Sequence, residues 1–169
     1  QGKVWGCGDD YYYQVHSTRV QVRGNYIVQT PTEITDFNPQ LENDEYIIQI
    51  ACGGYHTMFL TSQGKVYGCG LNKYFQVNST NGGAWYSKIQ TPTKITDFPQ
   101  LLSSDKIIQI ACGQYHTMFL TSQGKVWGCG YNEYYQVDST RVHVWGNYIV
   151  QKPTEITDFP HLSETGDKI

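Results

Sequence analysis

Short hydrophobic runs separated by polar, glycine-marked turns follow one another along this chain. The run at 46–53 is rich in β-branched residues, which favours a buried strand. The turn at 62–65 is a tight hairpin in which Gly64 takes a backbone conformation that a side chain would resist. No stretch has helical periodicity, so the pattern predicts an all-β fold. The strands predicted in this part of the chain are 46–53, 56–62, 65–70 and 89–95.

The same pattern of strands is written nearly three times. Residues 49–70 return as 109–130 with only two of 22 positions changed. Residues 1–8 repeat the tail of this stretch. We therefore divide the chain into the C-terminal half of a unit (1–37), two complete units (46–98 and 106–159) and the start of another (160–169).

Four strands in a repeat of about 45–60 residues are typical of a β-propeller blade, whereas solenoids usually have shorter repeats of about 20–30 residues. The sequence predicts about two and a half blades of four antiparallel strands each, which form an incomplete ring within one propeller domain. An incomplete ring has open strand edges. We therefore expect the chain to belong to a longer protein or to be held in a larger assembly.

Composition excludes several classes of function. The net charge is −3 and the 12 Lys and Arg residues are scattered, which does not favour nucleic-acid binding. No apolar run approaches the roughly 20 residues of a membrane span. Phosphate-binding, dinucleotide-binding and nucleophile motifs are absent from the sequence, so we expect no enzyme activity, no cofactor and no membrane partner.

The five cysteines are two repeated positions, each set between small residues. Cys7, Cys69 and Cys129 form one set, and Cys52 and Cys112 form the other. We expect a small, buried residue at both positions. Disulfides within a unit are the alternative, but the odd count argues against them, and the spacing does not suit zinc.

Several linked positions resemble the repeat of the regulator of chromosome condensation family. They read ACGGYHTMFLT, GKVYGCGLN and YFQV within 51–77, and ACGQYHTMFLT, GKVWGCGYN and YYQV within 111–137. The resemblance implies a ring of about seven blades. It also implies a choice of functions, because the founding protein exchanges nucleotide on the small GTPase Ran and binds nucleosomes, whereas others are light receptors, ciliary scaffolds or recruitment domains.

One departure from the family concerns the motif Gly-Gln-Leu-Gly. Here it reads Tyr-Gln-Val-His at 13–16, Phe-Gln-Val-Asn at 75–78 and Tyr-Gln-Val-Asp at 135–138. Both glycines are replaced, so we expect a more constrained turn. The departure weakens the transfer of exchange-factor function. The aromatic residues of these segments recur in register, which indicates packing within or between blades.

The repeated histidines and glycines have a structural interpretation. The resemblance implies that His56 and His116 bond to backbone across the blade, and neither is expected to bind a metal or to act in catalysis. The glycines are expected where turns form or sheets crowd together. These structural positions are Gly53, Gly64, Gly68, Gly70, Gly113, Gly124, Gly128 and Gly130.

Variable loops are the predicted interface with other proteins, because Trp, Tyr and Arg dominate binding hot spots. The candidates are Arg19, Arg23, Trp85, Tyr86, Arg141, His143 and Trp145. We expect a non-catalytic scaffold within a larger assembly; the alternative is a guanine-nucleotide exchange factor for a Ran-like GTPase. The expected partners are other proteins, the remaining blades of a longer chain and, in the alternative, the GTPase. The expected location is intracellular, in a cytoplasmic, cytoskeletal or ciliary setting.

Overall fold

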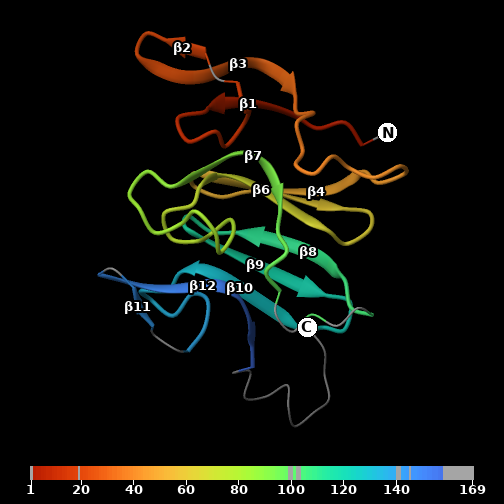
Figure 1. Cartoon of the computed structure of the whole chain (residues 1–169), viewed down its shortest axis with the longest axis vertical. Coiled ribbons are helices and arrows are strands. Elements are labelled where there is room, and N and C mark those ends of the chain that lie inside the picture. Colours follow the sequence, from red (N-terminus) through yellow and green to blue (C-terminus); the bar gives the residue numbers. More distant parts are fainter. Residues whose placement is uncertain are drawn as a thin grey trace.

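Three antiparallel sheets lie one below another along the long axis of the computed structural model, as Figure 1 shows. The structure describes residues 2–18, 20–98, 101, 104–139, 142–144 and 146–157. The first sheet has the order β1-β3-β2, with β1 at Trp5–Asp9, β2 at Val20–Val22 and β3 at Asn25–Glu33. The second has the order β4-β5-β6-β7, with β4 at Ile47–Cys52, β5 at His56–Thr61, β6 at Val66–Leu71 and β7 at Lys88–Lys94.

The third sheet has five strands in the order β11-β12-β10-β9-β8. They are β8 at Ile107–Cys112, β9 at His116–Thr121, β10 at Val126–Tyr131, β11 at His143–Val144 and β12 at Asn147–Ile156. The fold is therefore all-β, with antiparallel sheets of propeller type that do not close into a ring, as predicted. The division of the chain into blades stays a prediction, and its last part, 160–169, lies outside the described residues.

Strand alternation sends the side chains of β5 into two different cores. Met58 and Leu60 point toward the third sheet, where they join Phe119 and Trp127 of that sheet. Phe59 points the other way and joins a core with the first sheet. Because successive side chains of a strand face opposite sides, one hydrophobic strand contributes to both seams between sheets.

Two positions of the second sheet require glycine, each for a different reason. Gly64 has φ +78° in the hairpin between β5 and β6, a conformation that costs other residues energy. Gly68 has an ordinary φ, but a Cβ atom added there would lie 2.6 Å from the Met58 sulfur and 2.8 Å from Val77. The first glycine is needed for backbone shape and the second for space.

The last main strand of each unit bends beside a proline. In the second sheet the register between β6 and β7 shifts between Gly68 and Gly70, next to Pro92. Asn38 of the first unit's linker uses this bend, because its N–H donates to the Pro92 carbonyl at 2.7 Å and its own carbonyl accepts from Lys94 at 2.9 Å. The same register shift recurs beside Pro31 and Pro153. The proline therefore marks a bend, and in the second sheet this bend ties the two units together.

Two short strands were not predicted from the sequence. β2 pairs with the start of β3, and β11 pairs with the start of β12. The tight turns of these hairpins use Arg23 and Gly24, and Gly146, at positive φ. The first sheet therefore has three strands and the third has five, where half a blade and a complete blade of four strands were predicted.

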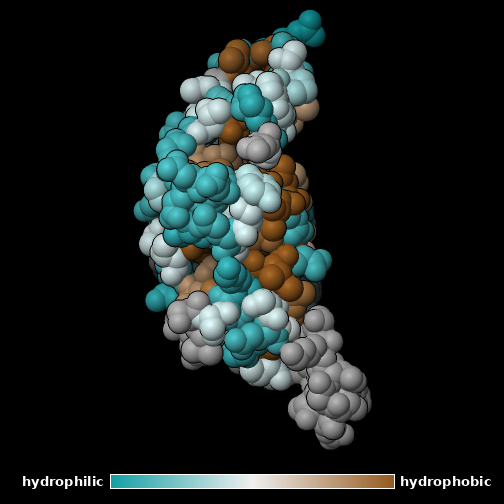
Figure 2. Space-filling model, turned by 90° about the vertical axis from the view of Figure 1, so that its right-hand side faces the viewer, coloured by the Kyte–Doolittle hydropathy of each residue, from teal (hydrophilic) through white to brown (hydrophobic). Residues whose placement is uncertain are grey.

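The chain presents its loops at two opposite edges of the sheets. Because β4, β5 and β6 alternate in direction, the loops 53–55 and 72–87 come together at one edge, as do their counterparts in the other units. We call this the loop edge; it lies on the left in Figure 1. The hairpin turns 62–65 and 122–125 lie at the other edge, the turn edge. Figure 2 views the turn edge and shows a hydrophilic area beside a hydrophobic stripe.

Candidate functional site

A hydrogen-bonded relay crosses the seam between the second and third sheets. The His56 ring lies 2.9 Å from the Thr117 hydroxyl through Nε2, and this hydroxyl donates to the Gln76 carbonyl at 2.6 Å. Since the hydroxyl donates its proton onward, His56 Nε2–H is the donor to Thr117. Burial lowers the pKa of His56 to about 3, and His116 contributes a smaller effect of the same sign. Burial therefore keeps the His56 ring neutral, and the hydrogen bond to Thr117 fixes its orientation.

The predicted partner of His56 was backbone across the blade, and the structure replaces it with the hydroxyl of the next sheet. The glycine before it supplies the space, because a Cβ atom on Gly53 would lie 2.2 Å from the His56 ring. Gly113 stands in the same relation to His116 at 2.0 Å. The pKa of His116 is lowered only by its partial burial. The structural role of the repeated histidines and glycines stays a prediction, which mutation can test.

The long loop of each unit is shaped around a buried polar side chain. Asn72 is fully buried; its Oδ1 accepts from the backbone N–H of Val77 and Asn78, and its Nδ2 donates to the Thr80 carbonyl at 2.8 Å. Asn132 repeats the bonds to its own loop. These bonds position the aromatic residues that precede Val77 and Val137.

The aromatic residues at the departure from the family motif hold a left-handed backbone. Tyr13, Phe75 and Tyr135 have φ of 64°, 62° and 58°. Glycine adopts this region without cost, whereas an aromatic residue pays about 1 kcal/mol or more. The turn therefore holds a conformation that is costly for its aromatic residue, and the expectation of a more constrained turn stays a prediction.

Tyrosine rings form a continuous row across all three sheets at the loop edge. Tyr12 of the first unit lies edge-on to Tyr55 at 5.5 Å between ring centroids, and Tyr55 stacks on Tyr115 at 5.9 Å. The row continues from Tyr115 to Tyr74 at 5.2 Å and from Tyr74 to Tyr131 at 4.9 Å. We call this row the tyrosine face; its members are Tyr11, Tyr12, Tyr26, Tyr55, Tyr74, Tyr115, Tyr131 and Tyr134.

A lysine of the second unit reaches into this aromatic surface. The Lys73 ammonium lies 3.2 Å from the centroid of the Trp85 ring and 4.6 Å from that of Tyr74. Trp85 and its neighbour Tyr86 are 75% and 72% exposed. The predicted loop residues Trp85 and Tyr86 therefore border the tyrosine face, and the lysine holds the indole in place.

Of the other predicted interface residues, two are described by the structure and three are not. Arg23 is exposed in the turn between β2 and β3, and the His143 ring on β11 lies edge-on to Tyr148 at 5.2 Å. Arg19, Arg141 and Trp145 lie outside the described residues. Their role as an interface stays a prediction.

The tyrosine face was not predicted as a continuous row, because the contacts that join one unit's rings to the next are made across the seams. Tyr74 contacts two rings of the third sheet, whereas its counterpart Tyr134 is 79% exposed. Packing was expected for both. Among the described residues no sheet follows the third, so Tyr134 and Tyr135 have less to cover them. A tyrosine after each Gly-Gly or Gly-Gln turn, at 55 and 115, was the available signal.

The cysteines also depart from the expectation of uniform burial. Cys69 and Cys129 are buried beneath the preceding sheet, with each sulfur 3.9 Å from the carbonyl of Gln14 or Gln76. Cys7 and Cys52 are exposed, because they face regions where the described residues provide fewer covering strands. All five are free thiols, so the disulfide alternative is wrong for this structure.

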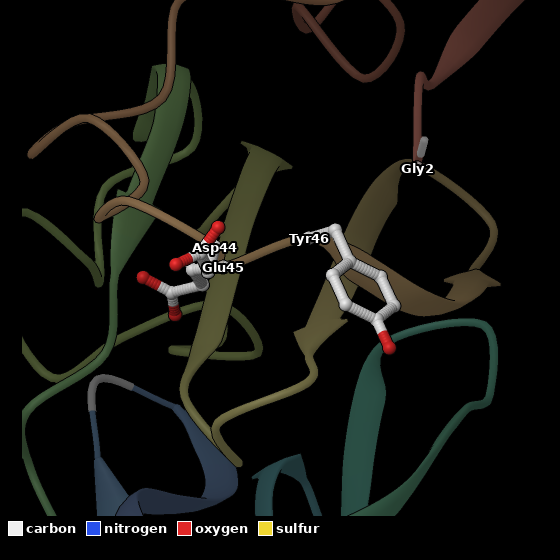
Figure 3. Close-up of a pocket in the computed structure, with 4 residues that line it drawn as sticks. All are labelled: Gly2, Asp44, Glu45 and Tyr46. Atoms are coloured by element: carbon white, nitrogen blue, oxygen red, sulfur yellow. The ribbon is translucent and has the colours of Figure 1, made fainter.

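A hollow lies at the turn edge, between the start of the chain and the start of β4. It has a volume of about 430 Å³ and is lined by Gly2, Asp44, Glu45 and Tyr46. Figure 3 shows Asp44 and Glu45 together and the Tyr46 ring directed away from them. The Glu45 side chain is fully buried and pairs with Lys65 at 3.2 Å. Its carboxylate therefore has a structural partner and does not form a reactive pair with Asp44.

Within the described part of the chain, no three His, Cys, Asp or Glu side chains gather closely enough to share a metal ion. The same residues include no helix of the length and hydrophobicity that crossing a membrane requires.

The fold and its repeated seams define a class, the β-propellers built from repeated blades. The chain belongs to the family of the regulator of chromosome condensation (RCC1) repeat, whose repeats match residues 1–60 and 63–120, and in a second description 47–76 and 107–136. The family and the propeller fold were both predicted from the sequence.

Curated relatives extend this finding. The chain is 31% identical over 135 residues to a human protein described as RCC1-like G exchanging factor-like protein, with 76% of this chain and 27% of that protein covered. It is 33% identical to Xenopus laevis regulator of chromosome condensation, over 68% and 24% of the two chains. With Arabidopsis thaliana ultraviolet-B receptor UVR8 it shares 39% over 53% and 19%. The chain thus spans about a quarter of these relatives.

Solved structures show the same fold. Prp20p from Saccharomyces cerevisiae, described with its binding to Gsp1p and histones, superposes with a TM-score of 0.70 at 20% identity, covering 94% of this chain and 35% of that one. Human WBSCR16 gives a TM-score of 0.68 at 23% identity, covering 93% and 41%. At these identities the likeness concerns the fold alone.

Proposed function

We propose that this chain is part of a non-catalytic propeller scaffold that binds other proteins through its loop edge. The observation that carries the proposal is the tyrosine face, a row of rings that runs over three sheets and is bordered by the exposed Trp85 and Tyr86. Tyrosine and tryptophan supply large contact areas at low entropic cost and are enriched at binding hot spots.

The distribution of rigidity supports this interface. The buried Asn72 and Asn132 hold the loops from within, while the aromatic rings remain at the surface. A surface that is ordered before binding loses less entropy when the partner arrives. The loop edge therefore combines exposed aromatic area with a fixed backbone.

Capture of partners from cells with the intact protein tests this proposal. Trp85→Ala combined with Tyr86→Ala removes two exposed rings from the loop edge, and we expect at least about a tenfold loss of the specific partners. Gln63→Ala combined with Gln123→Ala changes the two hairpin turns at the turn edge and serves as the control. Equal capture by all three proteins would exclude the loop edge as the interface.

The second candidate is a guanine-nucleotide exchange factor for a Ran-like GTPase. It is favoured by the likeness to a protein described as an RCC1-like G exchanging factor-like protein and by the fold shared with Prp20p, which is described with its binding to Gsp1p. Release of a fluorescent nucleotide from a purified Ran-like GTPase tests it. Faster release with the intact protein supports exchange activity, and an unchanged rate excludes it for that GTPase.

The cellular setting is also part of the proposal. We place the protein inside the cell, in a cytoplasmic, cytoskeletal or ciliary assembly. Five free thiols support a reducing compartment, because disulfides are rare where glutathione keeps thiols reduced. Fluorescence microscopy of the tagged protein tests this location, and a secreted protein would contradict it.

A further inference from the structure

A hollow of about 460 Å³ opens at the first-unit end of the tyrosine face. Four of its lining residues are tyrosines: Tyr11, Tyr12, Tyr26 and Tyr55. Tyr11 stands edge-on to Tyr12 at 4.9 Å and to Tyr26 at 6.1 Å, so the rings form walls at steep angles to one another. Asp9, Asn25 and Ile27 complete the lining. An enclosure of ring faces with a carboxylate at its wall attracts a cation, because aromatic faces carry negative potential.

The second unit shows which kind of group binds among aromatic rings at the corresponding position. The position of Tyr11 is taken there by Lys73, and that of Tyr12 by Tyr74. The Lys73 ammonium lies over the rings of Tyr74 and Trp85. The same loop scaffold, with the same aromatic position beside it, therefore places a lysine ammonium against rings within this molecule.

The first unit differs from the second in two residues that both favour a ligand cation. Tyr11 adds a ring at the position where the second unit has the positive charge of Lys73. Asp9 adds a negative charge at the position where the second unit has Leu71. Asp9 is exposed, and one of its oxygens accepts a hydrogen bond from the Tyr11 N–H at 2.9 Å, which fixes the carboxylate beside the hollow.

The electrostatics around Tyr12 agree with this arrangement. The pKa of the Tyr12 phenol is raised, first by burial and then by the neighbouring phenols of Tyr11, Tyr55 and Tyr86 and the carboxylate of Asp9. The phenols are uncharged at neutral pH, so among these neighbours the Asp9 carboxylate carries the negative charge that favours a cation in the hollow.

We propose that the hollow formed by Asp9, Tyr11, Tyr12, Tyr26 and Tyr55 binds the cationic side chain of a lysine presented by a partner protein. The inference rests on the proposed function, because it assigns the chemistry of the partner at one end of the same face. The ammonium contacts the ring faces, and Asp9 supplies the opposite charge. Methylation of the lysine keeps its charge and strengthens contact with the rings, whereas acetylation removes the charge.

Capped lysine is the probe for this site. The intact protein, labelled with carbon-13 in its tyrosine rings, is titrated by NMR with N-acetyl-lysine methylamide and with its Nε-trimethyl and Nε-acetyl forms. We expect the tyrosine rings of the hollow to shift with the first two probes, and the trimethyl form to bind about tenfold more tightly than the Nε-acetyl form. Equal binding of the trimethyl and Nε-acetyl forms would overturn the proposal.

Two substitutions taken from the second unit test the residues. Tyr11→Lys introduces the internal cation that Lys73 provides there, and Asp9→Leu removes the carboxylate. We expect at least about a tenfold loss of trimethyl-lysine binding for the first and a few-fold loss for the second. Tyr46→Ala, which removes a half-exposed tyrosine from the turn edge, is the control and should bind as the wild type. Wild-type affinity in Tyr11→Lys would contradict the proposed site.

The two proposals fail in distinguishable ways. If the probes do not bind but cellular partners are still lost with the Trp85 and Tyr86 substitutions, the cation site is wrong and the loop-edge interface stands. If the probes bind and partner capture is unaffected by those substitutions, the hollow binds cations but the proposed interface is wrong.

Discussion

Two strands of identical sequence, β5 and β9, differ in how deeply they are buried. Both read HTMFLT, yet every residue of β5 is buried, whereas β9 alternates between buried and half-buried positions. β5 has a sheet on each side, and β9 has the second sheet on one side only among the described residues. Burial in a repeat protein is therefore a property of the neighbouring unit as much as of the sequence.

The strands β4 and β8 also differ in burial, but here the copy in the third sheet is the more deeply buried one. Ile110 on β8 is 2% exposed because it packs against the second sheet, while Ile50 at the same position on β4 is 45% exposed. Ile50 faces the first sheet, whose described strands are β1, β3 and β2 only. At each seam, the inner strands of one unit therefore pack against the hydrophobic face of the next unit.

Substitution of the repeated leucine should have the largest effect. Leu60 is fully buried, whereas Leu120 is half-buried and borders a hollow of about 180 Å³. We expect Leu60→Ala to lower the free energy of unfolding by about 2–5 kcal/mol and Leu120→Ala by about half as much. Urea unfolding of the intact protein, followed by circular dichroism, measures both. Equal losses would mean that another surface covers the third sheet in the protein.

The strands, the hairpin turn at Gly64 and the family could be predicted because each depends on residues close together in the sequence. The alternation in 56–62 and the glycine in the turn act locally, and the repeat makes them visible twice. The left-handed Phe75 could not be predicted from propensity, because tertiary packing overrides an unfavourable backbone conformation. Phe75 is 2% exposed and lies against Gly82, where an added Cβ atom would be 2.3 Å from its ring.

The candidate site was only partly predictable for a different reason. Trp85 and Tyr86 could be chosen from their residue types in a variable loop. The contact between Tyr12 and Tyr55 joins residues 43 positions apart and depends on how one unit is rotated against the next. No pattern within a single unit contains that geometry.

The repeated histidine should give the next largest effect, as a dependence on pH. His56 is neutral in the fold with a pKa of about 3, whereas in the unfolded chain its pKa is about 6.5. Between these values the unfolded state binds the extra proton, so stability is present above about pH 6.5 and decreases as the pH falls. We expect this one group to cost about 3 kcal/mol between pH 6.5 and pH 4.

Denaturant unfolding at several pH values, with His56→Gln and His116→Gln, isolates this contribution. The His56 variant should be less stable at pH 7 but should lose most of the acid sensitivity of the wild type. The His116 variant should retain it, because the His116 pKa is lowered only by partial burial. Identical pH profiles for the two variants would show that the two histidines have the same surroundings.

The repeated glutamine should give the smallest of the three effects. The Gln49 side chain makes two hydrogen bonds to the backbone of Ile110, as a neighbouring strand would. Its Nε2 donates to the Ile110 carbonyl at 2.7 Å and its Oε1 accepts from the Ile110 N–H at 2.9 Å. Gln49→Ala leaves both backbone groups of Ile110 without this partner and should cost about 1–2 kcal/mol. Gln109 is exposed on the third sheet, so Gln109→Ala should change the free energy of unfolding by less than about 0.5 kcal/mol. Hydrogen exchange of the Ile110 amide adds a local readout, because only Gln49→Ala should accelerate it. Slow exchange in that variant would mean that the seam is held by side-chain packing and that the amide pair adds little.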